Sequence, residues 1–228
     1  MGDFGLYLAF MIPPLVLGLA VQAWLKRTFA SYSNVPLASG LQGAQVARQI
    51  LARNGLEEVP VETSPGGALS DHYDPRKKAL YLSEPVFYPT SVAAAAVAAH
   101  ETGHALQDAR GYAPLRIRSA MYPAVAFASN AWIWLLILGA VLGALNLVAL
   151  ALAIYAIAVL FHIVTLPVEF NASRRAAVQL HELGIVGAGE GAGVQKVLRA
   201  AALTYVAGAL AAISLLLYYA LVFFGNRD

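Results

Sequence analysis

The sequence contains no cysteine, and this absence excludes several kinds of chemistry. There is no disulfide framework, no thiolate nucleophile and no thiolate metal site. Any metal must therefore be held by His, Asp or Glu. Five histidines are available for such a site, namely His72, His100, His104, His162 and His181.

Charge is also scarce. Only 12% of the 228 residues are charged and 59% are hydrophobic, whereas about 25% of residues are charged in a typical soluble domain. This composition indicates a chain surrounded by membrane lipid. The formal net charge of +2 is too small to indicate a nucleic-acid partner, and we expect none.

Long uncharged runs account for most of the hydrophobicity. A bilayer core requires about 20 apolar residues in a helix, and Phe4–Leu25 fits as a retained anchor. No residue between Arg118 and Glu169 is charged, and one helix of that length would extend roughly 75 Å. This run must therefore fold back, with Asn146 as the expected turn. We predict a single membrane-embedded domain over residues 1–228, with spans at about 4–25, 124–145, 147–168 and 202–224.

Four spans place both termini on one side of the membrane and two polar regions, about 26–120 and 169–200, on the other. Fourteen of the fifteen basic residues lie in these polar regions, and Arg227 is the exception. Because basic residues concentrate on the cytoplasmic side of membrane proteins, we predict that the polar regions face the cytoplasm and that both termini lie outside.

The first polar region carries patterns for a small mixed fold. Its predicted elements are a helix over 41–54, a short strand over 59–63, two extended runs over 69–73 and 78–83 joined by a turn at 74–77, and an Ala-rich helix from Ser91 to about Asp108. The predicted fold class is therefore a mostly α membrane protein, with about four transmembrane helices and a small cytoplasmic α+β region.

The Ala-rich helix contains the sequence His100-Glu101-Thr102-Gly103-His104. Residues four apart lie on one helical face, so both imidazoles can reach one zinc ion. Glu101 is rotated by about 100° from His100, so it reaches the water that the metal activates. This H-E-x-x-H pattern is typical of zinc proteases, so the predicted α+β region resembles zincin metalloproteases. It predicts one zinc ion per chain, with Glu101 as the catalytic acid and base.

Catalytic zinc usually has a third protein ligand. Glu169 is favoured because it is the first charge after the predicted hairpin, which returns to the side of the membrane that it left. His162, His181, His72 and Asp71 remain as alternatives. Asn171 and Ser173 are candidates for orienting a ligand. The candidates for stabilising the oxyanion are Arg174, Arg175, His181 and Tyr205.

Several motifs together resemble the YugP-type neutral zinc metallopeptidases, a bacterial membrane family. They are DHYDPR at 71–76, AAHETGHALQD at 98–108, LPVEFNASRRA at 166–176 and VLRAAALTYV at 197–206. The resemblance implies a zinc-dependent peptidase of the bacterial inner membrane, with His100 and His104 as ligands. A wider similarity to the HtpX and CAAX-prenyl-protease group implies a third ligand at Glu169. Asn171 departs from the Asp expected at its position.

The predicted function is therefore a zinc-dependent endopeptidase that cleaves protein or peptide substrates at the cytoplasmic face. In zinc proteases of this general kind an extended edge pairs with the substrate backbone, and Lys78–Ser83 is the candidate here. One alternative is a non-catalytic, zinc-stabilised scaffold that binds partner proteins. A transporter that uses His162 is a further alternative, although the spans contain few ionisable groups. The sequence identifies no regulatory partner.

Overall fold

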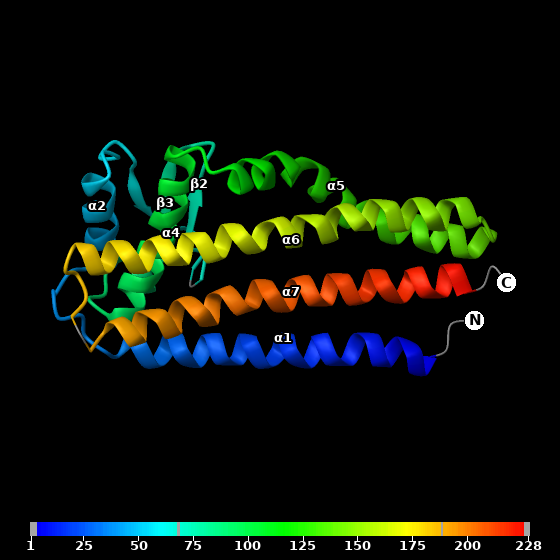
Figure 1. The fold of residues 1–228 in the computed structure, drawn as a ribbon, viewed down its shortest axis with the longest axis horizontal. Helices are drawn as coiled ribbons and strands as arrows, with labels where there is room; N and C mark the ends of the chain where they lie inside the picture. The colour runs from blue at the N-terminus through cyan, green and yellow to red at the C-terminus, as the bar shows by residue number, and fades with distance from the viewer. Residues whose placement is uncertain (1–3, 68, 188, 226–228) are drawn as a thin grey trace. The chain divides into compact units, whose positions relative to one another are not determined.

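The computed structural model describes residues 4–67, 69–187 and 189–225 (Figure 1), so Arg227 lies outside the described residues. Two compact units are present. Unit 1 comprises the described residues of Met1–Val21, Arg116–Pro167 and Thr204–Asp228, and unit 2 comprises those of Gln22–Leu115 and Val168–Leu203. The elements in chain order are α1 (Phe4–Ser33), α2 (Gly43–Arg53), β1 (Val61–Thr63), β2 (His72–Asp74), β3 (Ala79–Leu82), α3 (Glu84–Phe87), α4 (Val92–Ala109), α5 (Ala113–Leu142), α6 (Leu145–Glu182) and α7 (Gly191–Gly225).

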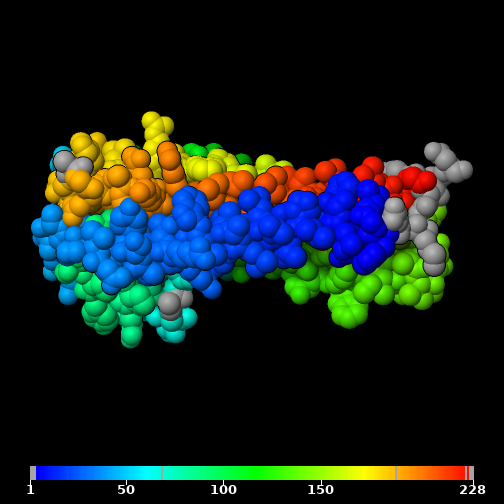
Figure 2. Space-filling view, turned by 90° about the horizontal axis from the view of Figure 1, so that it is seen from below, coloured from blue at the N-terminus to red at the C-terminus, as the bar shows by residue number. Residues whose placement is uncertain are grey.

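Unit 1 is built from apolar helix segments. Among the described residues, four helices are long and apolar enough to cross a membrane, namely α1, α5, α6 and α7, which confirms the predicted number. Large apolar side chains face outward on them, with Leu19 64% exposed and Val141 77% exposed. The apolar N-terminal part of α1 lies at the surface in Figure 2. A soluble protein rarely exposes apolar surface on this scale, so the chain is a mostly helical membrane protein.

The reversal between α5 and α6 lies earlier than the sequence predicted. It occurs at Gly143, whose φ is +62°, and Asn146 lies in the first turn of α6. Glycine adopts this left-handed conformation without steric cost, so it ends α5 there. The Ala144 N–H then donates to the Gly139 carbonyl at 2.8 Å, which closes the helix end. The prediction of the turn at Asn146 was therefore wrong by about three residues.

Unit 2 contains a three-stranded sheet in the order β1-β3-β2. β3 pairs parallel with β1 and antiparallel with β2. The turn between β2 and β3 is fixed by Asp74, whose Oδ1 accepts the N–H groups of Arg76 and Lys77 at 2.8 and 3.2 Å. The three predicted strands and the turn are thus present, although β2 begins three residues later than the predicted run 69–73 and includes Asp74.

The prediction that Lys78–Ser83 forms a substrate-binding edge was wrong. The run Lys78–Ser83 contains β3, which has a partner strand on each side. Its backbone groups are used in two ladders, so it cannot receive a substrate strand. The sequence indicated the hairpin with β2 but carried no sign that β1 would pair on the other side.

α4 is the centre of unit 2. It begins where the sequence predicted, because the Ser91 hydroxyl accepts the Ala94 N–H at 3.2 Å and caps the helix. Its alanines are buried on two sides. Ala98 and Ala105 pack in the core that includes the sheet residue Leu80, and Ala95, Ala96 and Ala99 pack in the core that includes α2, α6 and α7. These small side chains let several elements approach the helix closely.

Candidate metal site

α4 and α6 bring three ligand-type side chains together within unit 2. His100 and His104 lie one turn apart on α4, and Glu169 lies on α6. Each offers one ligand atom, and these atoms all lie within 4.8 Å of one another. His100 is 8% exposed, His104 is 7% exposed and Glu169 is 1% exposed. Three buried metal-ligand groups thus meet at one point.

The carboxylate of Glu169 faces both imidazoles. Its Oε2 lies 3.2 Å from His100 Nε2 and 3.6 Å from His104 Nε2. Burial alone would raise the pKa of Glu169, but the interactions with the two histidines outweigh it and hold the pKa well below its usual value. The carboxylate is therefore ionised at neutral pH, which is the form that binds a metal.

The other ring nitrogen of each histidine has a partner of its own. Ser173 Oγ lies 3.1 Å from His100 Nδ1, and Gln107 Oε1 lies 3.0 Å from His104 Nδ1. A carbonyl oxygen can only accept, so His104 Nδ1 carries the proton and donates it to Gln107. In a neutral His104 the Nε2 atom, which lies 3.6 Å from Glu169 Oε2, would then carry the lone pair that a metal requires. Such partners fix the orientation of ligand imidazoles.

Gln107 joins the two helices behind His104. It is completely buried, and its Nε2 donates to the Val168 carbonyl at 2.8 Å and to Asn171 Oδ1 at 3.0 Å. Because its amide nitrogen has these two acceptors, its oxygen must face His104. Asn171 therefore acts on the histidine through Gln107 and not by direct contact, and it needs no negative charge to do so.

A glycine sets the distance between α4 and α6. A Cβ atom at Gly103 would lie 2.6 Å from the backbone oxygen of Ala172 and 3.1 Å from its Cα. Only glycine allows this approach. Ala172 lies on α6 between Glu169 and Ser173. Gly103 therefore places the carboxylate within reach of the histidines.

Glu101 differs from its neighbours in exposure. Residues 102–107 of α4 are buried, whereas Glu101 is half-buried. It follows His100 directly on α4, so its side chain leaves the helix about 100° around the axis from that of His100. Its role in proton transfer stays a prediction.

The remaining candidates for the third ligand lie outside this group. The His72 ring stacks on Tyr81 with centroids 5.0 Å apart, and its Nδ1 lies 2.8 Å from the Ser70 carbonyl. Asp71 accepts the Ser83 N–H at 2.7 Å, and burial raises its pKa. His181 is exposed in the last turn of α6, and His162 belongs to unit 1.

The candidates for oxyanion stabilisation are dispersed. Arg174 is exposed and lines a separate pocket with Arg175. Arg175 Nε donates to Asn171 Oδ1 at 2.7 Å. Tyr205 lies on α7 in unit 1. The role of each stays a prediction.

Sequence reasoning missed Gln107 and Gly103. The spacing of Gln107, three residues after His104 on the same helix, was a signal that could have identified it. Gly103 lies inside the motif, and a glycine in the middle of an otherwise strong helix indicates a close packing contact. Its partner, Ala172, could not be identified without the structure.

Two comparisons with known proteins bear on this arrangement. The family described as "Putative neutral zinc metallopeptidase" matches residues 7–224. The "Putative membrane protease YugP" of Bacillus subtilis (strain 168) is 45% identical over 223 residues, which is 98% of this chain and 99% of the relative. No solved structure matches the chain.

Proposed function

The chain belongs to the neutral zinc metallopeptidase family, and from this we propose that it is a zinc-dependent membrane endopeptidase. The observation that carries the proposal is the meeting of His100, His104 and Glu169, whose ligand atoms lie within 4.8 Å of one another in a buried position. Membership of the family supports zinc as the metal and peptides as the substrates.

The donor set fits zinc. Two imidazoles and one carboxylate are the protein ligands of one common class of catalytic zinc site, which keeps its fourth position open. The partners of His100 and His104 support the same assignment. Ser173 and Gln107 occupy the Nδ1 sides of the rings, and this leaves the two Nε2 atoms directed at Glu169. We infer one zinc ion per chain, held by these three residues.

Glu101 is the group that we assign to proton transfer. Bound zinc supplies a Lewis acid that polarises a carbonyl and lowers the pKa of a coordinated water towards about 7. Glu101 accepts the proton of the attacking water and then donates it to the leaving amine. Its partial exposure, beside buried ligands, supports this role because a substrate must be able to reach it.

The oxyanion that develops during attack needs a donor besides the metal. Arg174, His181 and Tyr205 keep this role as proposals. Each can be mutated without changing a proposed metal ligand, because the group of His100, His104 and Glu169 includes none of them.

A substrate strand requires an open sheet edge. The central position of β3 leaves the outer sides of β1 and β2. We favour β2, because the hydroxyl of its Tyr73 donates to Asp108 of α4 at 2.8 Å and so holds this edge against the metal-bearing helix. Main-chain pairing at such an edge provides affinity that depends little on sequence, which suits an enzyme acting on unfolded or membrane-proximal segments.

We further propose that the site faces the cytoplasm of a bacterial inner membrane and that both termini lie outside. The distribution of the basic residues supports this orientation. The alternative function is a zinc-stabilised scaffold that binds partner proteins. A structural zinc site normally has four protein ligands and has no need of Glu101.

The proposal is tested by comparing the proteomes of cells that carry the native chain or Glu101→Gln. If the chain is a peptidase, a set of proteins should accumulate only with Glu101→Gln. The control is Glu58→Gln, at an exposed position in the loop before β1, and it should produce no such set. A scaffold predicts that the native and Glu101→Gln proteomes are the same.

A further inference from the structure

Unit 2 has a second feature that the proposed catalysis does not use. A pocket of about 210 Å³ lies between the end of α4 and α6, and three of its seven lining residues are arginines. The lining residues are Leu106, Arg110, Asn171, Arg174, Arg175, Val178 and Gln179. A pocket of this size admits a headgroup-sized ligand and is smaller than the 300–1,000 Å³ of sites for drug-sized molecules.

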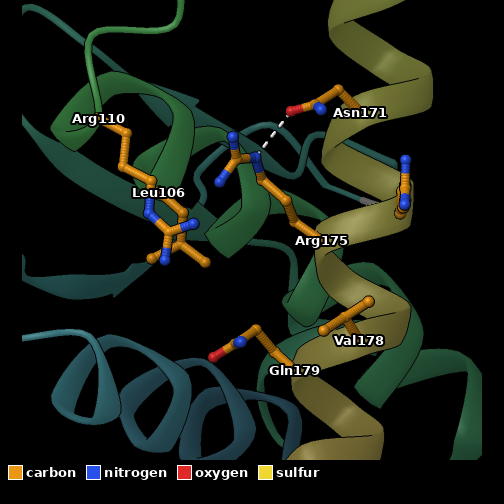
Figure 3. Close-up of a pocket in the computed structure, with 7 residues that line it drawn as sticks. Leu106, Arg110, Asn171, Arg175, Val178 and Gln179 are labelled. Carbon is orange, nitrogen blue, oxygen red and sulfur yellow. Dashed lines mark hydrogen bonds between the residues drawn. The ribbon is translucent and has the colours of Figure 1, made fainter.

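Two of the guanidinium groups converge in the pocket. In Figure 3 the side chain of Arg110, from the end of α4, and that of Arg175, from α6, extend toward one another. Arg175 Nε donates to Asn171 Oδ1 at 2.7 Å, and one terminal nitrogen of Arg110 donates to Asn54 Oδ1 at 3.2 Å. A guanidinium has five N–H donors, so these bonds hold both groups in place while most of their donors remain available to a ligand.

The positive charge of the pocket is not balanced by the protein. In the part of the chain that the structure describes, no carboxylate forms an ion pair with Arg110, Arg174 or Arg175. Gln179, which also lines the pocket, donates through its Nε2 to Glu182 at 3.1 Å. Partial burial, and after it the charge of Arg110, lowers the pKa of Arg175. A bound anion would remove this repulsion.

The position of the pocket along α6 indicates the source of the anion. Arg174 and Arg175 follow the end of the predicted span, residue 168, by six and seven residues, a rise of roughly 9–11 Å. The headgroup layer begins at the edge of the hydrocarbon core and is about 5–8 Å deep on each side, and long arginine side chains cover the difference. Val178, which is 44% exposed, adds an apolar wall.

We propose that this pocket binds the phosphate of an anionic phospholipid headgroup. Arginine pairs bind phosphate oxygens through bidentate hydrogen bonds, and basic pockets at the cytoplasmic ends of transmembrane helices suit such headgroups. The pocket is distinct from the metal site, although it shares Asn171 with the network behind His104. The proposal stands whether or not the chain is a peptidase.

The test uses the purified full-length chain in detergent and counts bound lipid by native mass spectrometry. Phosphatidylglycerol and phosphatidylcholine with the same acyl chains are compared, since both carry a phosphate but only the first is anionic overall. We expect the native chain to prefer phosphatidylglycerol at least tenfold. Arg110→Gln/Arg175→Gln should lose this preference, and Arg110→Gln alone, at an exposed position, should reduce it.

The matched control is Arg116→Gln/Arg199→Gln, which removes two exposed positive charges near other span ends. It should keep the preference of the native chain. Equal losses in the two double variants would show general attraction to a basic surface and overturn the proposal, as would an unchanged preference in Arg110→Gln/Arg175→Gln. Arginine-dependent binding of inorganic phosphate, or of a peptide with a free C-terminal carboxylate, without binding of phosphatidylglycerol would also overturn it.

Discussion

His104 Nδ1 lies 3.0 Å from the side-chain oxygen of Gln107, a residue with no exposed surface. The same side chain donates to Val168 and Asn171 on α6, so one amide orients a histidine that we propose as a metal ligand and also connects α4 with α6. Groups of this kind typically contribute 10–100-fold to metal affinity.

Replacing Gln107 should therefore weaken zinc binding. We expect Gln107→Leu, which keeps the approximate size but removes both hydrogen-bonding groups, to raise the Kd for zinc by about 10–100-fold. The Kd is measured by competition with a chelator. Gln195→Leu, at an exposed position on α7, is the control and should bind zinc like the native chain. An unchanged Kd in Gln107→Leu would contradict the orienting role.

Because α4 and α6 approach closely at Gly103, a larger residue there should destabilise the chain. In Gly103→Ala the new Cβ would meet the Ala172 backbone at 2.6 Å, so the helices must separate. We expect a loss of about 1–3 kcal/mol in the free energy of unfolding, as for other overpacked sites, together with weaker zinc binding. Gly191→Ala, where a Cβ would meet nothing within 4 Å, should change neither thermal unfolding nor zinc content. Native-like behaviour of Gly103→Ala would show that this contact does not set the ligand geometry.

The identity of the third ligand is tested by removing one candidate at a time. Glu169→Gln keeps the shape of the side chain but removes its charge, and we expect zinc affinity to fall by at least about 100-fold, more than for an outer partner. His181→Ala, in the exposed last turn of α6, should retain zinc. Retention by Glu169→Gln together with loss by His181→Ala would reverse the assignment.

The absence of cysteine allows a direct test of the orientation. Leu142→Cys at the end of α5 and Glu58→Cys in unit 2 each introduce one exposed thiol. The predicted topology places Leu142 outside and Glu58 in the cytoplasm. A membrane-impermeant maleimide should label Leu142→Cys in intact cells and Glu58→Cys only after permeabilisation. The opposite labelling pattern would invert the proposed orientation.

Local signals in the sequence were sufficient for much of unit 2. The Ser91 cap, the Asp74 turn and the spacing of His100 and His104 each depend on residues close in the chain, and the elements that they predicted are present. The proximity of Glu169 to the histidines was predicted in a different way, from the return of a membrane hairpin to its starting side.

Features that depend on distant packing were not predictable in the same way. The turn between α5 and α6 is a different case, because Gly143 has the left-handed φ of +62° that glycine adopts without steric cost, and this preference was already present in the sequence. β1 and β3 pair in parallel although they lie about 20 residues apart in the chain. No local sequence pattern predicted this pairing. The contact of Gln107 with Asn171 spans 64 residues, so the network behind His104 became visible only in three dimensions.

The most direct test of the proposed function is the rate at which purified, zinc-loaded Glu101→Gln cleaves a protein substrate, measured beside the native chain with zinc quantified in both. We predict equal zinc content and a rate at least about 100-fold lower in Glu101→Gln, because general acid–base catalysis typically contributes 10²–10⁴-fold. Cleavage by zinc-loaded Glu101→Gln at the native rate would contradict the mechanism.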